Sequence, residues 1–382
     1  MKQHGRGKIR IAIIGTVGLP ANYGGFETLA DNLVRYAEKR HLPCEIEVYC
    51  SARSFPQRLR RWHGAILRYI PLNANGAASP LYDLCSMVLA ARRGADVILV
   101  LGVSGMVFLP LLRLVTTARY IINVDGLEWR RAKWNKLASR FLRLSEAFAV
   151  RFGHSVISDN QAIVDHISAS YSRSSILIPY GGDHAAEGEA PEAAENSDQL
   201  PERYALMLCR IEPENNVHVI LESFASDVSM PLVAVGNWQS SRYGRDLVAR
   251  YGCSPNIQLL EPIFEQNRLF ALRTNAVLYV HGHSAGGTNP SLVEMMYLKK
   301  PVIAFDCIYN RYSTESCAYY FKTSQQLLSK VQESDIVGLA QNGESMGEIA
   351  RRRYRWDTIG EAYFQLLLAP STSNNPFAST LK

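Results

Sequence analysis

Residues Gly282-His283-Ser284-Ala285-Gly286 match the G-x-S-x-G pattern in which a serine hydrolase presents its nucleophile on a tight turn. Such a serine needs a helix directly after it and a base to take its proton. Here the helix is delayed, because Asn289 as N-cap and Pro290 behind it predict a start at residue 290. All nine histidines lie at or before residue 283, so none follows Ser284 in the order that hydrolases of this type use. The motif therefore does not predict a hydrolase.

The same loop has the chemistry of an anion-binding site. Glycines leave backbone N–H groups accessible, and a helix N-terminus carries partial positive charge, so both favour a phosphate here. Glu294 lies in the second turn of the predicted helix. A carboxylate there can accept two hydrogen bonds from the vicinal hydroxyls of a ribose. Together these features describe a nucleoside diphosphate site, although a polar loop with a solvated glutamate explains the same residues without a ligand.

Short apolar segments alternate with helical segments along most of the chain, which predicts doubly wound parallel sheets of the α/β class. The alternation stops at an acidic, alanine-rich stretch and then resumes. We predict an N-terminal Rossmann-like domain at 1–184, a linker at 185–202, a C-terminal Rossmann-like domain at 203–350, a helix at 351–368 and a disordered tail at 369–382. A ligand is expected in the cleft between two such domains, beyond the strand ends.

Composition points to an anionic partner. Residues 1–184 carry 24 Lys+Arg and 13 Asp+Glu, or +11, and the remainder carries 17 and 22, or −5, which gives the total of +6. The basic half suggests nucleic acid, a lipid surface or a phosphorylated substrate. The seven cysteines form no C-x-x-C pair, so a reducing compartment is expected. No signal peptide is visible, and the longest uncharged run, 97–112, is too short to span a bilayer.

At this point the sequence resembles a known family. HSAGGTNPSLVEMMYLKKPVIAFD (283–306) looks like the donor-binding helix of GT-B glycosyltransferases of family 4, and its GGTNPSL-E form resembles the bacterial β-1,4-rhamnosyltransferase-like branch. The same branch is similar at IAIIGTVGLPANYGGFETLADNL (11–33), INVDGLEWRRAKW (122–134) and CRIEPENNVHVILESF (209–224). The resemblance spans both predicted domains and implies the GT-B fold, two Rossmann-like domains with an interdomain cleft.

The resemblance implies a retaining transfer of a sugar from a nucleoside diphosphate, without a metal or another cofactor. The chain has no Asp-x-Asp pair of the kind that holds a metal in other glycosyltransferases. The implied donor is dTDP-L-rhamnose. The implied acceptor is a saccharide on a polyprenyl diphosphate, in the biosynthesis of surface polysaccharide.

The family's functional residues carry over position by position. Glu294 matches the glutamate that binds the donor ribose, and Arg210 matches the arginine that neutralises the diphosphate. Where the wider family often has a lysine as a second cation, this chain has Asn215, and where it has a second glutamate, this chain has Gly286. The resemblance therefore implies that backbone N–H groups with Thr288 or Asn289 contact the donor sugar. Asp125 replaces a common histidine near the reacting sugar, where it could take a proton or steady positive charge; a turn-forming role in VDG is the alternative. The donor set from this loop and helix is Ser284, Gly287, Thr288, Asn289, Ser291 and Glu294.

Other strand ends supply further candidates. Asp159 and Tyr180 join Asp125 and Arg210 as catalytic candidates, although a helix cap at Asp159 or Asn160 and a tight turn beside Tyr180 are equally open. Gly24 and Gly25 precede a helix and suit close approach of a phosphate, with a plain turn as the alternative. The resemblance implies that Gly236 and Glu261 lie in the nucleotide base region of the family, while His281 and His283 are expected to pack or to bond the donor rather than to ligate a metal.

Residues 130–152 predict a basic amphipathic helix. Trp134, Leu137, Phe141 and Phe148 form its apolar stripe, and Lys133, Lys136, Arg140 and Arg143 form its basic one. A domain helix with a solvated basic face explains the pattern, but a membrane-borne acceptor favours contact with anionic lipid. We therefore expect a cytoplasmic protein that is peripheral at the inner face of the plasma membrane.

Two other functions fit parts of the same sequence. A nucleotide-sugar epimerase on the same fold would convert the nucleotide sugar without a lipid acceptor. A non-enzymatic nucleic-acid-binding module fits the basic first half, but the chain shows no recognised nucleic-acid motif, and we expect no nucleic-acid partner.

Overall fold

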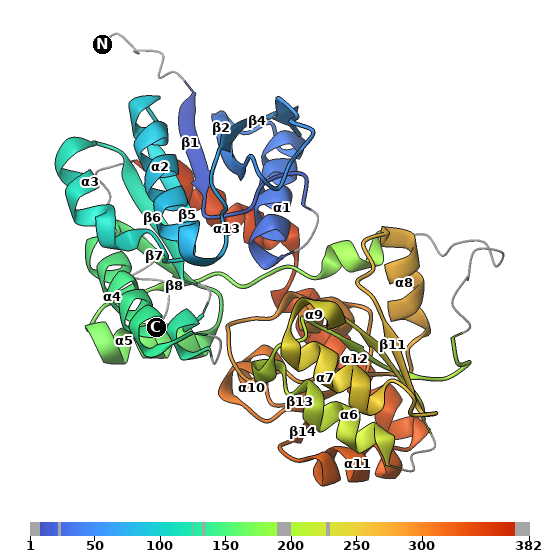
Figure 1. Ribbon diagram of the computed structural model, residues 1–382. Coiled ribbons are helices and arrows are strands. Elements are labelled where there is room, and N and C mark those ends of the chain that lie inside the picture. Colours follow the sequence, from blue (N-terminus) through green and yellow to red (C-terminus); the bar gives the residue numbers. More distant parts are fainter. Residues whose placement is uncertain are drawn as a thin grey trace. The chain divides into compact units, whose positions relative to one another are not determined.

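The computed structural model describes residues 8–21, 24–124, 126–131, 134–188, 200–226 and 230–370. The chain folds into two compact units. Unit 1 contains residues 1–130, 134–178 and 357–382, and unit 2 contains residues 131–133 and 179–356. Each unit has one sheet with helices around it (Figure 1). The predicted α/β fold class is therefore confirmed in both units.

Over the described residues, unit 1 is built on an eight-stranded sheet of order β3-β4-β2-β1-β5-β6-β7-β8. Neighbouring strands are parallel, except that β3 runs antiparallel to β4. The central strand β5 is buried over its whole length, as expected for a parallel sheet with both faces covered. The strands are β1 (Ile9–Ile14), β2 (Cys44–Ser51), β3 (Arg61–Trp62), β4 (Ala65–Ile70), β5 (Val97–Leu101), β6 (Arg119–Val124), β7 (Ser155–Ser158) and β8 (Ile176–Leu177).

The helices of unit 1 include the last helix of the chain. Residues Tyr36 of α1 and Phe364 of α13 stack with ring centroids 5.8 Å apart, and α13 lies near α1 in Figure 1. The Asn123 amide in β6 donates to the Tyr363 hydroxyl at 2.7 Å. The C-terminal helix is therefore part of the first unit. The helices are α1 (Gly25–Lys39), α2 (Ser79–Arg92), α3 (Leu109–Val115), α4 (Lys136–Phe152), α5 (Gln161–Tyr171) and α13 (Trp356–Leu368), whose first residue belongs to unit 2.

Unit 2 has a sheet of order β11-β10-β9-β12-β13-β14 in the part of the chain that the structure describes, and every pair is parallel. Its core is closed by apolar side chains that include Phe224, Trp238 and Phe321. The strands are β9 (Ala205–Leu208), β10 (Leu232–Val235), β11 (Ile257–Leu260), β12 (Leu278–His281), β13 (Val302–Phe305) and β14 (Tyr319–Phe321). The helices are α6 (Val217–Ala225), α7 (Arg242–Tyr251), α8 (Gln266–Asn275), α9 (Pro290–Tyr297), α10 (Ile308–Ser313), α11 (Ser324–Glu333) and α12 (Ile336–Arg353).

The division of the chain differs from the predicted boundaries. The first crossing to the C-terminal unit lies after Ile178 rather than at 184, because residues 179–184 pack within unit 2. The predicted helix 351–368 is the end of α12 followed, after a break at Tyr354 and Arg355, by α13. Most of the predicted linker, 189–199, and the predicted tail beyond Pro370 lie outside the described residues.

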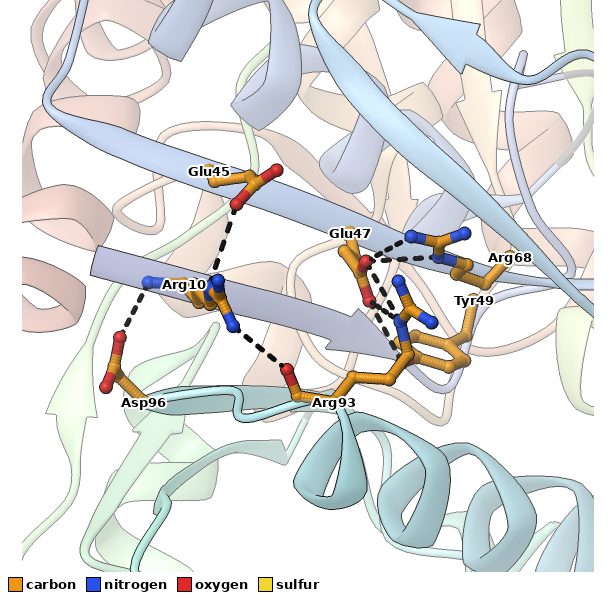
Figure 2. Close-up of polar contacts among 7 residues, drawn as sticks. All are labelled: Arg10, Glu45, Glu47, Tyr49, Arg68, Arg93 and Asp96. Atoms are coloured by element: carbon orange, nitrogen blue, oxygen red, sulfur yellow. Dashed lines mark hydrogen bonds and ion pairs between the residues drawn. The ribbon is translucent and has the colours of Figure 1, made fainter. Parts of the chain in front are cut away.

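An ion-pair network fastens one end of the unit 1 sheet (Figure 2). Its centre is Glu47 of β2, which accepts hydrogen bonds from Arg68 of β4 at 3.0 Å and from Arg93, after α2, at 3.1 Å. Burial would raise the pKa of Glu47, but the hydrogen bond and charge of Arg68, reinforced by Arg93, hold it below its usual value. Arg10, at the start of β1, adds a backbone N–H bond of 2.8 Å to Asp96. Because most of these groups cluster toward the amino ends of the strands, we assign them to stability rather than to ligand binding.

Candidate active site

The unit 2 sheet has a topological switch point between β9 and β12. Strands β10 and β11 lie on one side of β9, whereas β12, β13 and β14 lie on the other. In open parallel sheets, ligands bind beyond the carboxyl ends of the strands at such a point, because the two flanking loops diverge there. Arg210 follows β9, and the loop 282–289 follows β12. The fold therefore brings two predicted site segments to the same sheet edge.

The loop 282–289 is anchored on the segment that follows β9. The backbone N–H and the hydroxyl of Ser284 both donate to the Glu214 carbonyl, at 2.9 and 2.8 Å. A Cβ added to Gly282 would lie 2.0 Å from the Asn215 carbonyl oxygen, so only glycine fits this approach. The Ser284 proton is thus engaged with a carbonyl oxygen, which is too weak a base to activate it. This geometry agrees with the prediction that Ser284 is not a hydrolase nucleophile.

Helix α9 begins where the sequence predicts it. The Asn289 side chain caps the helix by accepting the Ser291 N–H at 3.1 Å, and it also accepts the Ser291 hydroxyl at 2.7 Å. The Tyr279 hydroxyl of β12 lies 2.8 Å from the Ser291 oxygen. Gly286 has φ +118°, a conformation that favours glycine. The helix end is therefore held rigidly against the strand, with a glycine turn before it.

Glu294 is a buried carboxylate with two partners. Only 6% of the residue is exposed. Nη2 of Arg273 in α8 donates to its Oε2, and Nε2 of His184 lies 3.1 Å from its Oε1. Burial would raise the pKa of Glu294, but the charge of Arg273 and then the hydrogen bond from His184 lower it to about 2. The carboxylate is therefore negatively charged at neutral pH, and each of its oxygens keeps a lone pair for a further hydrogen-bond donor.

Two imidazoles stack at the carboxyl end of β12. The rings of His281 and His283 are 4.4 Å apart between centroids and inclined by 11°. Burial lowers the pKa of His281 to about 3, and burial, followed by the charges of His281 and Arg210, lowers the pKa of His283. Both rings are therefore neutral at pH 7. Among the described residues, Nε2 of His281 and Nδ1 of His283 have no hydrogen-bond partner.

Two family models match separate parts of the chain. Residues 191–314 match the family "Glycosyl transferases group 1". Unit 2 carries a glycosyltransferase group 1 domain. Residues 8–183 match "Domain of unknown function (DUF1972)", so the other half of the chain has a family but no activity from that match. Comparison with curated proteins finds no match.

Solved structures with the same architecture confirm the GT-B fold. Sucrose-phosphate synthase from Thermosynechococcus elongatus superposes with a TM-score of 0.77 at 16% identity, over 95% of this chain and 100% of that chain. Anabaena Alr3699/HepE in complex with UDP-glucose gives 0.71 at 15% identity, over 94% and 99%. The α,α-trehalose 6-phosphate synthase of Burkholderia multivorans gives 0.69 at 12% identity, over 94% and 96%. At these identities the likeness establishes the fold alone.

The remaining predicted residues of the glycosyltransferase domain lie around the same sheet edge. Among the described residues, the exposed Arg210 guanidinium has no ion pair or hydrogen bond, so its charge is available to a ligand. The Asn215 amide donates to the Arg210 carbonyl at 2.7 Å and is therefore occupied in shaping this loop. Gly236 follows β10 and packs on Ile211, where a Cβ would lie 2.3 Å from its Cδ1. The other residues are Glu261, exposed after β11, Gly287, half-buried, and Thr288, buried.

The predicted residues of the N-terminal half are in part structural. The carboxylate of Glu27 lies at the α1 N-terminus, accepts the Val17 N–H at 2.7 Å, and would be 2.0 Å from a Cβ on Gly24. The Glu27 carboxyl group already fills the space beside Gly24, which weighs against the predicted phosphate at that helix end. Asn160 caps α5 by accepting the Ala162 N–H at 3.0 Å.

Two catalytic candidates are buried, and a third cannot be placed. Asp159 follows β7, and Tyr180 follows the first chain crossing into unit 2; each is nearly inaccessible to solvent. Asp125 lies outside the described residues. Across the described ranges, no group of three or more His, Cys, Asp or Glu side chains is placed to hold a metal ion.

Sequence reasoning missed the partners of Glu294. Arg273 lies in a helix with no motif, and His184 and Trp356 stand far from residue 294 in the chain. The Trp356 indole N–H donates to Nδ1 of His184 at 2.9 Å. No local signal in the sequence identifies these residues, because their relation to Glu294 is created by tertiary packing.

Helix α4 differs from the predicted amphipathic pattern. The side buried in unit 1 consists of Leu142, Ser145, Glu146, Ala149 and Val150. Leu137 of the predicted apolar stripe is 77% exposed, which a stripe packed in the core would not be. The physical reason is that Glu146 turns inward, where it accepts the Trp129 indole N–H at 2.9 Å and the Tyr171 hydroxyl at 2.8 Å. Lys133 lies outside the described residues.

The exposed side of α4 continues onto α3. Leu137 and Leu144 of α4 and Leu111, Leu114 and Val115 of α3 are all more than half exposed, and the two helices pack together. Beside them, an open groove of about 330 Å³ is lined by residues of α4 and α5: Arg140, Arg143, Leu144, Ala147, His166, Ser170 and Tyr171. In the portion of the chain that is described, no helix has the length and apolarity to cross a bilayer.

Proposed function

We propose that the protein is a retaining glycosyltransferase of family 4 that transfers L-rhamnose from dTDP-L-rhamnose to a saccharide on a polyprenyl diphosphate. The observation that carries the proposal is the arrangement at the switch point of the group 1 domain. The sheet edge where nucleotides bind holds a glycine turn, a capped helix end, a charged Glu294 and Arg210, whose guanidinium has no ion pair within the described ranges. The UDP-glucose complex of the Anabaena protein, which has the same fold, supports a nucleotide sugar as donor.

The chemistry follows from these groups. The bond between the anomeric carbon and the diphosphate oxygen breaks, and a bond from the acceptor oxygen forms on the same face. The acceptor proton passes to the leaving diphosphate. Arg210 and the N-terminus of α9 stabilise the charge that grows on the diphosphate. Glu294 accepts hydrogen bonds from the hydroxyls of the nucleotide's pentose ring. The ring offers one hydroxyl in dTDP and two in a ribonucleotide.

A donor screen tests this function. Purified protein is incubated with dTDP-L-rhamnose, UDP-glucose and a GDP-sugar, with and without a lipid-linked saccharide. Products are separated by chromatography, and their sugar identity and anomeric configuration are determined by NMR. We expect transfer from dTDP-L-rhamnose with retained configuration. Transfer from UDP-glucose alone would keep the glycosyltransferase and reject the rhamnose donor. Conversion of the nucleotide sugar in the absence of acceptor would instead identify an epimerase.

We also propose that the exposed α3 and α4 surface contacts the anionic lipid in which the acceptor is anchored. Exposed leucines lie beside Lys136, Arg140 and Arg143, so the surface combines apolar contact with positive charge. Each basic residue near an anionic bilayer contributes about 1 kcal/mol. The surface is therefore complementary to the inner face of a plasma membrane, where a polyprenyl-linked acceptor would be met.

Vesicle sedimentation tests the surface. Replacing Lys136, Arg140 and Arg143 by glutamine should weaken binding to acidic vesicles by about two orders of magnitude. The matched control replaces three α7 arginines, Arg242, Arg245 and Arg250, and should bind as the wild type does. Activity on a short water-soluble acceptor should survive in both variants. Failure of the wild type to sediment with acidic vesicles would refute the membrane proposal, and it would leave the sugar-transfer proposal unaffected.

A further inference from the structure

Two of the chain crossings between the units are joined by hydrogen bonds inside unit 2. The chain enters unit 2 at Pro179 and leaves it after Trp356. The Gly182 N–H donates to the Tyr354 carbonyl at 2.8 Å, and the Trp356 N–H donates to Oδ1 of Asp183 at 2.9 Å. These bonds join segments that are more than 170 residues apart in the chain. The two crossings therefore form one local structure.

That structure lies directly against the helix that carries Glu294. A Cβ added to Gly182 would be 2.5 Å from the Val293 carbonyl oxygen and 2.9 Å from the Glu294 nitrogen. A Cβ on Gly181 would be 2.5 Å from the Trp356 ring. Two glycines thus allow the first crossing to pack between the indole and α9 without a gap.

His184 bridges the indole and the carboxylate. An indole N–H is only a donor, so Nδ1 of His184, at 2.9 Å, must be the unprotonated acceptor. The proton of the neutral ring is then on Nε2, which lies 3.1 Å from Oε1 of Glu294 and donates to it. If the proton were on Nδ1 instead, a lone pair of Nε2 would face a lone pair of Oε1 of Glu294. Trp356 therefore determines that the imidazole presents a donor to Glu294.

We propose that His184 and Trp356 are positioning residues that hold the Glu294 carboxylate for the sugar ring of the nucleotide. The proposal rests on the proposed function, in which Glu294 accepts a hydroxyl of that ring. Arg273 holds Oε2 from α8, and the relay from Trp356 through His184 holds Oε1. Recognition of the hydroxyl then depends on an indole that does not itself contact the carboxylate.

The test compares nucleotides with and without the hydroxyl. Calorimetry measures the affinity for dTDP and its 3′-deoxy analogue, and for UDP and its 2′,3′-dideoxy analogue, so the result does not depend on the base. The wild type should favour each natural nucleotide by about tenfold or more, since the bond is to a charged acceptor. His184→Leu, which can neither donate nor accept, should reduce this ratio to about two or less. Trp356→Phe should also lower the affinity ratio between each natural nucleotide and its deoxy analogue.

A conservative variant separates positioning from folding. In His184→Gln, the amide can accept from Trp356 and donate to Glu294, so the hydroxyl ratio should recover to within about threefold of the wild type. A purely structural role predicts a different result, in which every variant loses equal affinity for both nucleotides of a pair. An unchanged ratio in His184→Leu, or an equal loss for both nucleotides, overturns the relay.

A second measurement does not need a ligand. Nitrogen chemical shifts of a histidine distinguish the two neutral tautomers, and His184 should show a protonated Nε2 in the wild type and a mixture in Trp356→Phe. The protonated Nδ1 form in the wild type would overturn the relay even if nucleotides bind. If the wild type binds none of the four nucleotides, the proposed function is refuted, and the proposed role of the relay is refuted with it. The two failures are thus distinguishable.

Discussion

Removal of the guanidinium of Arg273 should destabilise unit 2 more than any exposed substitution. Arg273 is 8% exposed and donates to a carboxylate that is 6% exposed, so Arg273→Met leaves Glu294 charged, buried and held by His184 alone. Breaking one side of a buried ion pair costs about 3–5 kcal/mol. For a unit of this size, 1 kcal/mol corresponds to about 2–4 °C in the unfolding midpoint. We therefore expect a loss of roughly 6–20 °C.

The assay is thermal and urea unfolding at pH 7, with Arg250→Met as the control, because Arg250 is an exposed arginine at the end of α7. The double variant Arg273→Met, Glu294→Gln removes the stranded charge, so it should be more stable than the sum of the single losses by about 1–3 kcal/mol. A loss below about 1 kcal/mol for Arg273→Met, or additive losses in the double variant, would refute the reasoning.

The acid dependence of the same variants has a definite sign. The folded-state pKa of Glu294 is lowered to about 2 from its usual 4.5. Its pairing therefore contributes stability above pH 4.5 that is lost as the pH falls toward 2. Glu294→Gln should flatten this part of the stability profile.

Three further changes test other parts of the structure. Arg210→Ala should lower kcat more than donor affinity, because charge on the diphosphate grows in the transition state; a loss of affinity with kcat unchanged contradicts this. Ser284→Ala should keep most activity and lose about 1 kcal/mol, since it removes one hydrogen bond to Glu214, whereas stoichiometric labelling of Ser284 by a fluorophosphonate would point to a nucleophile. Burial raises the pKa of Asp83 to about 7, so folding holds its proton and stability should fall as pH rises from about 4 to 7; Asp83→Asn should abolish that slope in denaturant titrations, and an unchanged slope would contradict it.

Local chemistry made part of the site predictable. Asn289 and Pro290 fix the start of α9 because a cap needs only the residues beside it. The parallel sheets follow from alternating segments, as in β1 and β5. By contrast, the partners of Glu294 come from α8 and from the two chain crossings. Their positions depend on how whole elements pack, which a single sequence does not encode in any short pattern.

The buried side of α4 shows a second limit. Periodicity places Leu137 and Phe141 on one apolar stripe but does not decide whether that stripe faces the core or a lipid surface. In the fold, the inward position is held by Glu146, whose carboxylate is buried with hydrogen bonds from Trp129 and His166. A buried carboxylate with several partners can thus set the helix rotation, which the pattern of apolar residues does not indicate.

The return of α13 to unit 1 also matters for synthesis on the ribosome. Unit 2 is inserted within unit 1, so the stacking of Phe364 on Tyr36 must wait until the end of the chain has been made. At about 5–20 residues per second, the delay between Ile178 and Leu368 is on the order of 10–40 s. During that time the sheet of unit 1 lacks the helix whose Tyr363 hydroxyl accepts a hydrogen bond from the Asn123 amide. A truncated first half ending near residue 178 should therefore be a natural target for chaperones, and a soluble version would need α13 restored through a short engineered connection.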